Sequence, residues 1–144
     1  MDEKSIKHLE LVQGVINRIA NNSFFLKGWT ITLTAALFTL AAKDSNRTFA
    51  ILALFPALAF WGLDAYYLRM ERRFRRLYEK ICSSNTGSPV PPFSMAINNC
   101  NNVDSWFLTL FSPTIVYVHG IVIALILAVT IGLPHLSRLF GTIQ

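Results

Sequence analysis

Three ionisable residues stand inside or at the edge of long apolar stretches of this chain: Lys27, Asp64 and His119. A charged side chain in hydrocarbon costs at least about 2.5 kcal/mol, so each group needs a polar partner or a water-filled cavity. If the first two apolar stretches run antiparallel, Lys27 and Asp64 lie at matching depth and His119 enters from the same side. We therefore expect an intramembrane polar cluster. A functional cluster would hold a closed state or line a conduction path. The alternative is a structural ion pair, with Lys27 reaching to the membrane interface and His119 only hydrogen-bonded.

A second group of residues that could bind a ligand is basic. The stretch 69–82 follows the middle apolar segment and carries five arginines: Arg69, Arg72, Arg73, Arg75 and Arg76. Guanidinium groups bind phosphate oxygens with two parallel hydrogen bonds, so this stretch could bind a nucleotide, a lipid head group or an acidic partner. A topology signal without any ligand would also explain it. The candidate binding residues are Arg72, Arg73 and Arg76, because they lie off the apolar stripe of this helix.

Motifs of enzymes are missing from the sequence. It has no glycine-rich phosphate loop, no nucleophile elbow, and no histidine or cysteine set with metal-ligand spacing. The two cysteines, Cys82 and Cys100, form no disulfide framework and are expected to be free thiols. We therefore expect neither an enzyme nor a cofactor or metal. The net charge of +5 comes from residues that flank apolar segments, so nucleic acid is not favoured as a partner.

The apolar residues fall into three blocks, 24–42, 48–68 and 113–133, in which charges are nearly absent. A helix of about 20 residues crosses a hydrocarbon core of roughly 30 Å. The sequence therefore predicts an all-α integral membrane protein with three transmembrane helices. The linker 43–47 allows only a tight hairpin, so the first two spans run antiparallel. The second span continues into the basic stretch 69–82 without a glycine or proline to end the helix.

The arginines also predict the topology. By the positive-inside rule the stretch 69–82 lies in the cytoplasm, and the hairpin then places the N-terminus there as well. We expect a multi-pass protein of the bacterial inner (plasma) membrane, with the tail 135–144 outside. The chain is expected to divide into four parts: an amphipathic cytoplasmic helix (1–22), a transmembrane helical hairpin with its basic extension (23–82), a polar loop (83–105), and an interfacial segment, third transmembrane helix and tail (106–144).

Local signals complete the prediction for the first half of the chain. Residues 2–20 carry an apolar stripe at helical spacing, which we expect to pack on the similar stripe of the basic extension. Asn21, Asn22 and Ser23 favour turns and caps over helix interiors and predict a joint before the first span. Pro56 should bend the second span, since it lacks a backbone donor.

The second half reads as a loop followed by two helices. Turn-forming residues dominate 83–105 and predict a loop. Asp104 or Ser105 could cap a short interfacial helix over 106–111. The third span is bracketed by Pro113 and Pro134.

Two stretches have a distinctive composition: HLELVQGVINRIANNSFFLKGW (8–29) and FWGLDAYYLRMERRFRRLYEKI (60–81). In the first, an asparagine pair precedes a span that begins Lys-Gly-Trp, and in the second a span ends on Trp-x-x-Asp-Ala-Tyr-Tyr. On these features, which cover the first eighty or so residues, the chain resembles a family of small multi-span bacterial membrane proteins, most of them uncharacterised. These proteins are similar to membrane effectors of anti-phage defence systems, in which a sensor triggers a small membrane protein that disrupts the bilayer. The resemblance concerns size and architecture, and it transfers no binding residue.

Architecture and resemblance together lead to one functional hypothesis and one rival. The first is an oligomeric inner-membrane effector that permeabilises or depolarises the membrane when a cytoplasmic signal, a nucleotide or a sensor protein, engages it. Its partners would be membrane lipid and further copies of the chain. The alternative is a non-conducting anchor or scaffold that recruits a soluble partner through its cytoplasmic helices.

Overall fold

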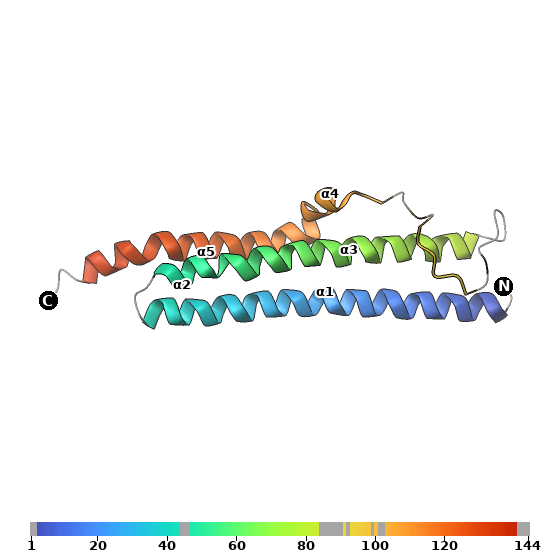
Figure 1. Ribbon diagram of the computed structural model, residues 1–144, viewed down its shortest axis with the longest axis horizontal. Coiled ribbons are helices and arrows are strands. Elements are labelled where there is room, and N and C mark those ends of the chain that lie inside the picture. The colour runs from blue at the N-terminus through green and yellow to red at the C-terminus, as the bar shows by residue number, and fades with distance from the viewer. Residues whose placement is uncertain are drawn as a thin grey trace. The chain divides into compact units, whose positions relative to one another are not determined.

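The computed structural model describes residues 3–43, 47–83, 91, 93–98, 100 and 103–140, with the backbone alone for Arg47 and residues 133–140. Every regular element in this part of the chain is a helix (Figure 1). In chain order the elements are α1 (Glu3–Lys43), α2 (Arg47–Leu52), α3 (Leu54–Ser83), α4 (Trp106–Leu110) and α5 (Pro113–Phe140). Among the described residues, three helical stretches are long and apolar enough to cross a membrane: Glu3–Lys43, Thr48–Ser83 and Pro113–Gly132. The predicted all-α class and the three helices of membrane-spanning length are confirmed.

The chain forms two compact units, which are described separately. The first consists of Met1–Phe24 and Ala65–Thr109 and contains the arginines of the basic stretch; it is called the basic unit below. The second consists of Phe25–Asp64 and Leu110–Gln144 and is called the apolar unit. The two groups of candidate functional residues thus belong to different units. The polar cluster belongs to the apolar unit, and the arginines belong to the basic unit.

Helix α1 continues without a break through Asn21, Asn22 and Ser23, so the joint predicted there is wrong. Each of these residues costs a helix interior only several tenths of a kcal/mol relative to alanine. Ending one helix and starting another would instead leave up to four carbonyls and four N–H groups without helical partners. Asn21 and Asn22 are exposed, so their side chains do not disturb a packed core.

The second predicted span and its basic extension form an almost continuous helix. α2 and α3 are separated by Ala53 alone, whose N–H still donates to the Phe49 carbonyl at 3.3 Å. Pro56 accounts for this interruption, because it cannot donate to the Leu52 carbonyl and its ring crowds that group. The helix is therefore disturbed by Pro56, as expected, and the interruption lies about one turn before the proline. Beyond this point α3 runs without a break to Ser83, as predicted.

The predicted loop and the short helix after it are confirmed within the described residues. Residues 91, 93–98, 100 and 103–105 form no regular element, and α4 begins at Trp106. Ser105 is its cap: the Leu108 N–H lies 3.4 Å from Ser105 Oγ, and the Thr109 N–H donates to the Ser105 carbonyl at 3.0 Å. Of the two predicted capping residues, Ser105 therefore has this role.

Helix α5 begins at Pro113, as predicted, but it continues past Pro134 to Phe140. The expected helix end at residue 133 is wrong, and the first part of the expected tail 135–144 is helical. A proline within a helix removes one backbone hydrogen bond, but each residue that continues the helix beyond it gains one, and the helix end leaves the same number of unpaired carbonyls wherever it lies. Continuing the helix is therefore the less costly arrangement. Residues 141–144 lie outside the described part of the chain.

In the basic unit the apolar stripe of α1 packs against the stripe of α3, as predicted. One buried cluster joins the two helices and the segment after α3: Leu9, Val12 and Ile16 from α1, Leu77 and Ile81 from α3, and Cys100. Phe74, Tyr78 and Ile97 pack against its edge. This cluster packs the apolar face of α3 against α1. The polar face of α3, which carries the arginines, therefore points to solvent.

In the apolar unit small residues bring the helices together. Ala53 and Ala57 pack with Val122 and Ile126 of α5, and α2 lies beside α5 (Figure 1). Alanines at such contacts allow the close backbone approach typical of membrane helices. Most of the apolar surface stays outside: only 17% to 28% of the residues in the most apolar window of each long helix are buried. That surface is suited to contact with lipid or with further protein.

Candidate functional site

The polar cluster of the apolar unit is centred on Asp64. Lys27 Nζ lies 2.7 Å from Asp64 Oδ2 and donates to Asp64 Oδ1 at 2.8 Å. His119 Nε2 lies 3.2 Å from Oδ2, and because a carboxylate only accepts, the histidine nitrogen is the donor. The structure thus brings together the three residues expected at matching depth, one each from α1, α3 and α5.

The cluster is enclosed. The side chains of Asp64 and His119 have no exposed surface, and that of Lys27 keeps 21% of its surface exposed. Removing one partner from such a pair leaves an uncompensated buried charge, which typically costs about 3–5 kcal/mol. The cluster therefore fixes the packing of three helices as long as all its charges are present.

Trp61 covers the histidine and was missed by the sequence analysis. Its ring stacks on that of His119, with centroids 6.3 Å apart and planes 8° from parallel. Its Nε1–H donates to the Leu110 carbonyl at 3.0 Å, and Phe111 contacts the indole edge-on. The spacing could have indicated this role, since Trp61 precedes Asp64 by three residues and so lies on the same face of α3.

Two buried side-chain polar atoms among the described residues lack a hydrogen-bond partner, His119 Nδ1 and Thr34 Oγ1. A buried polar atom without a partner typically costs about 1–3 kcal/mol. Other threonines of α1 bond to their own helix: Thr30, Thr32 and Thr39 each donate to the carbonyl four residues earlier. The histidine therefore offers an unused nitrogen directly beside an ion pair, where a proton, a water molecule or an ion could bind.

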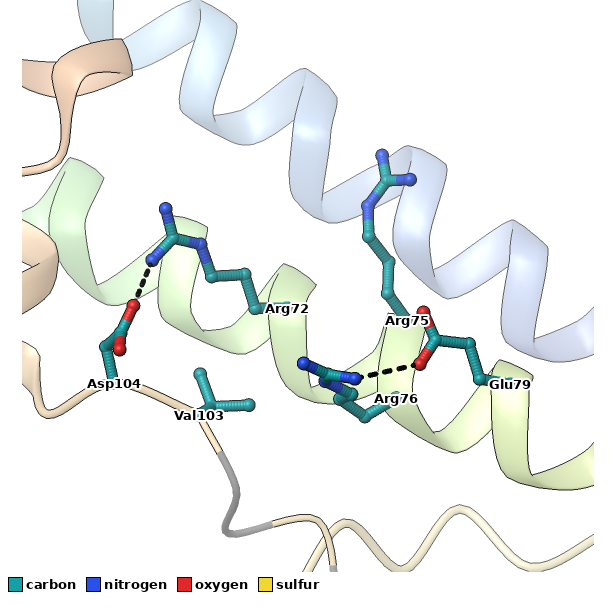
Figure 2. A pocket seen from close by; sticks show the side chains of 6 residues that line it. All are labelled: Arg72, Arg75, Arg76, Glu79, Val103 and Asp104. Carbon is teal, nitrogen blue, oxygen red and sulfur yellow. Dashed lines mark hydrogen bonds and ion pairs between the residues drawn. The ribbon is translucent and has the colours of Figure 1, made fainter.

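In the basic unit, three arginines of α3 line a cavity of about 390 Å³ with Glu79 and with the segment before α4. The cavity, called the arginine pocket below, is lined by Arg72, Arg75, Arg76, Glu79, Val103 and Asp104 (Figure 2). Its volume lies in the range of small-molecule sites, roughly 300–1,000 Å³. The chain thus forms a concave, basic surface outside the apolar unit.

Carboxylates of the chain already occupy the guanidinium groups of this pocket. Arg72 Nη1 lies 2.9 Å from Asp104 Oδ2, and Arg76 Nη1 lies 3.2 Å from Glu79 Oε2 (Figure 2). Arg75 pairs with Glu71 at 2.7 Å. Because the side chains of Asp104 and Glu79 are exposed, their ion pairs contribute only about 0–1 kcal/mol each. A stronger partner can therefore replace these carboxylates.

Not all of the predicted binding residues Arg72, Arg73 and Arg76 lie at this pocket. Arg72 and Arg76 line the pocket, Arg73 does not, and Arg75 takes a place there that the sequence analysis gave to Arg73. The second wall of the pocket comes from the segment around Asp104, 32 residues from Arg72 in the chain. Helical spacing alone does not reveal where such a segment docks, so it does not decide which arginines face it.

His8 is a further contact that the sequence did not indicate. It is buried, and its Nε2 lies 2.9 Å from the Ser94 carbonyl, to which only an N–H can donate. Its ring also contacts Phe93, whose φ of 59° is unusual for a residue other than glycine. His8 thus holds the segment after α3 on the face of α1.

The cysteines are free thiols, as expected: Cys82 is exposed and Cys100 is buried. Among the described residues, no group of three or more histidine, cysteine or acidic side chains could hold a metal ion. No family model, curated protein or solved structure matches this chain.

Proposed function

We propose that this chain is a membrane-embedded, homo-oligomeric effector of the bacterial inner membrane, which permeabilises or depolarises the membrane when a cytoplasmic signal engages its basic unit. The observation that carries the proposal is the enclosed cluster of Lys27, Asp64 and His119. Ionisable groups inside a membrane-spanning region are costly and most often belong to ion or proton paths. In a single copy these groups pair with one another, so this arrangement corresponds to the closed state.

Opening then requires that the cluster exchange its internal contacts for others. Three helices have too little polar lining to enclose a conducting path, which is why we propose several copies around one. The large exposed apolar surface of the apolar unit supports this assembly, because lipid and neighbouring copies can both cover it. A signal can drive the change only if it binds the open and closed assemblies with different affinity.

The biological setting that we propose is anti-phage defence. Residues 8–29 and 60–81 resemble a family of small multi-span bacterial membrane proteins, which are similar in size and architecture to the effectors of such systems. The division of the chain into a basic unit and an apolar unit fits an effector of this kind. The basic unit is too small for a catalytic domain, so the signal would be made by another protein.

The test is membrane potential, measured with a voltage-sensitive dye in cells that express the chain with and without its genetic neighbours. We expect depolarisation only when the trigger is supplied to the wild type, and constitutive depolarisation in Asp64→Asn, which loses the charge that pairs with Lys27. Glu3→Gln is the matched control, since it removes an exposed carboxylate from the same protein. An unchanged potential in every strain would contradict the proposal.

A second function, a non-conducting anchor for a soluble partner, is favoured by one specific feature. A groove of about 500 Å³ lies on the basic unit, lined by Ile6, Leu9, Glu10, Gln13, Gly14, Asn17 and Tyr78. A Cβ atom at Gly14 would meet nothing within 4 Å, so Gly14→Ala fits there, and the longer side chain of Gly14→Leu extends into the groove. If the chain is an anchor, a protein encoded by a genetic neighbour co-purifies with the wild type and Gly14→Ala but not with Gly14→Leu, and no strain depolarises.

A further inference from the structure

The arginines of the pocket share one face of α3. Arg72, Arg75 and Arg76 stand at positions i, i+3 and i+4, which places their side chains next to one another on a helix. Each of the three guanidinium groups is paired with a carboxylate: Arg72 with Asp104, Arg76 with Glu79 and Arg75 with Glu71. An anion can therefore bind these arginines by replacing one of the carboxylates.

The carboxylate partners are poorly suited to hold these arginines. The side chains of Asp104 and Glu79 are 60% and 63% exposed, and ion pairs at that exposure are weak. A phosphate group is tetrahedral and directs its oxygens in more than one plane, whereas a carboxylate is planar, and both match the guanidinium fork. It can therefore bridge two arginines at once, as neither carboxylate does here.

We propose that the arginine pocket binds a phosphate group, and that the Asp104 carboxylate occupies the place of that phosphate when no ligand is bound. Arg72 and Arg76 contact the phosphate directly, and Val103 provides an apolar wall beside it. Arg75 lines the pocket and stays paired with Glu71, whose side chain is only 14% exposed. The phosphate belongs either to a soluble nucleotide or to a lipid head group, which offer the same chemistry to the arginines.

Ligand binding has a structural consequence through the displaced residue. Asp104 is held twice on α3: its carboxylate pairs with Arg72, and its carbonyl accepts from Arg69 Nε at 3.2 Å. The next residue, Ser105, caps α4. A phosphate at Arg72 removes the first of these contacts and loosens the chain directly before α4. That this loosening triggers the membrane change rests on the proposed function, whereas the binding itself does not.

The experiment measures binding to the full-length chain purified in an uncharged detergent. Pyrophosphate is titrated by calorimetry as the soluble probe, and short-chain phosphatidylglycerol is compared with phosphatidylcholine by the shift in thermal stability as the lipid probe. Arg72→Gln should lower the affinity for the bound probe about tenfold, the loss of one charge-assisted contact. Arg18→Gln, an exposed arginine of α1, is the control for charge and should change it less than twofold.

Asp104→Asn is a second test, in which the affinity for the probe is expected to rise. It removes the internal competitor, so it should raise the affinity several-fold, while Glu3→Gln should leave it unchanged. Binding of pyrophosphate with this pattern supports a soluble ligand, and a stability shift with phosphatidylglycerol alone supports a lipid. Absence of binding by both probes overturns the proposal, as does an equal loss in Arg18→Gln. Binding with this pattern but without any depolarisation in cells would contradict the proposed function and leave the phosphate site standing.

Discussion

Asp64→Asn is the change whose consequence follows most directly from the structure. The amide keeps the size of the carboxylate and an acceptor for His119 Nε2, but it leaves Lys27 without a counter-charge. A broken buried pair costs about 3–5 kcal/mol, and the 21% exposure of Lys27 lets its ammonium reach polar surroundings in part. We therefore expect a loss of about 3 kcal/mol in the free energy of unfolding, or roughly 150-fold in the unfolding constant.

The assay is unfolding by SDS in mixed micelles, followed by tryptophan fluorescence, because Trp61 stacks on His119 and reports on the cluster. The double variant Lys27→Met with Asp64→Asn removes both charges and should recover most of the loss, since neither charge is then left alone. Glu3→Gln, whose pair with Lys7 is exposed, should cost under about 1 kcal/mol. A cost of that size for Asp64→Asn as well, or additive effects in the double variant, would refute the reasoning.

Three further predictions concern other contacts. Trp61→Phe loses the hydrogen bond to the Leu110 carbonyl and should lower stability by about 1 kcal/mol in the same assay. His8→Ala removes the donor to the Ser94 carbonyl, so hydrogen exchange should speed up in the segment around Ser94 while the apolar unit keeps its protection; unchanged exchange would count against that contact. Ser105→Ala removes the side-chain cap of α4 and should cost about 1 kcal/mol, again by SDS unfolding, whereas Ser105→Asn should restore it.

The polar cluster could be predicted from the sequence because ionisable residues are rare in long apolar segments. A lysine, an aspartate and a histidine in apolar helices must find partners, and a tight hairpin brings two of them to the same depth. The packing of α1 on α3 in the basic unit could be predicted for a similar reason, since the apolar stripes at Leu9 and Leu77 have few other surfaces to cover.

Two kinds of feature could not be predicted: contacts that depend on where a distant segment of the chain packs, and helix bounds that depend on competing free-energy costs. Whether Arg73 or Arg75 faces the pocket depends on where the Asp104 segment lies, and no local pattern encodes that. The continuation of helices through Asn22 and Pro134 reverses two local preferences. A break at Asn22 would add two helix ends with unpaired backbone groups, and past Pro134 the residues that continue the helix gain more backbone hydrogen bonds than the proline removes. The contact at His8 joins residues 86 apart in the chain and has no signature in either stretch.

The account rests on a bilayer around the apolar unit, with the arginine-bearing end of α3 on the inner face. The most direct measurement is labelling of Cys82, which is exposed at that end, by a membrane-impermeant maleimide in a Cys100→Ala background. Intact spheroplasts should leave Cys82 unlabelled until the membrane is opened. A second variant carries Lys43→Cys and Cys82→Ala, so its cysteine lies at the C-terminal end of α1, which the predicted topology places outside. It should be labelled in intact spheroplasts. Labelling of Cys82 in intact spheroplasts, or recovery of the chain from the aqueous fraction without detergent, would contradict the account.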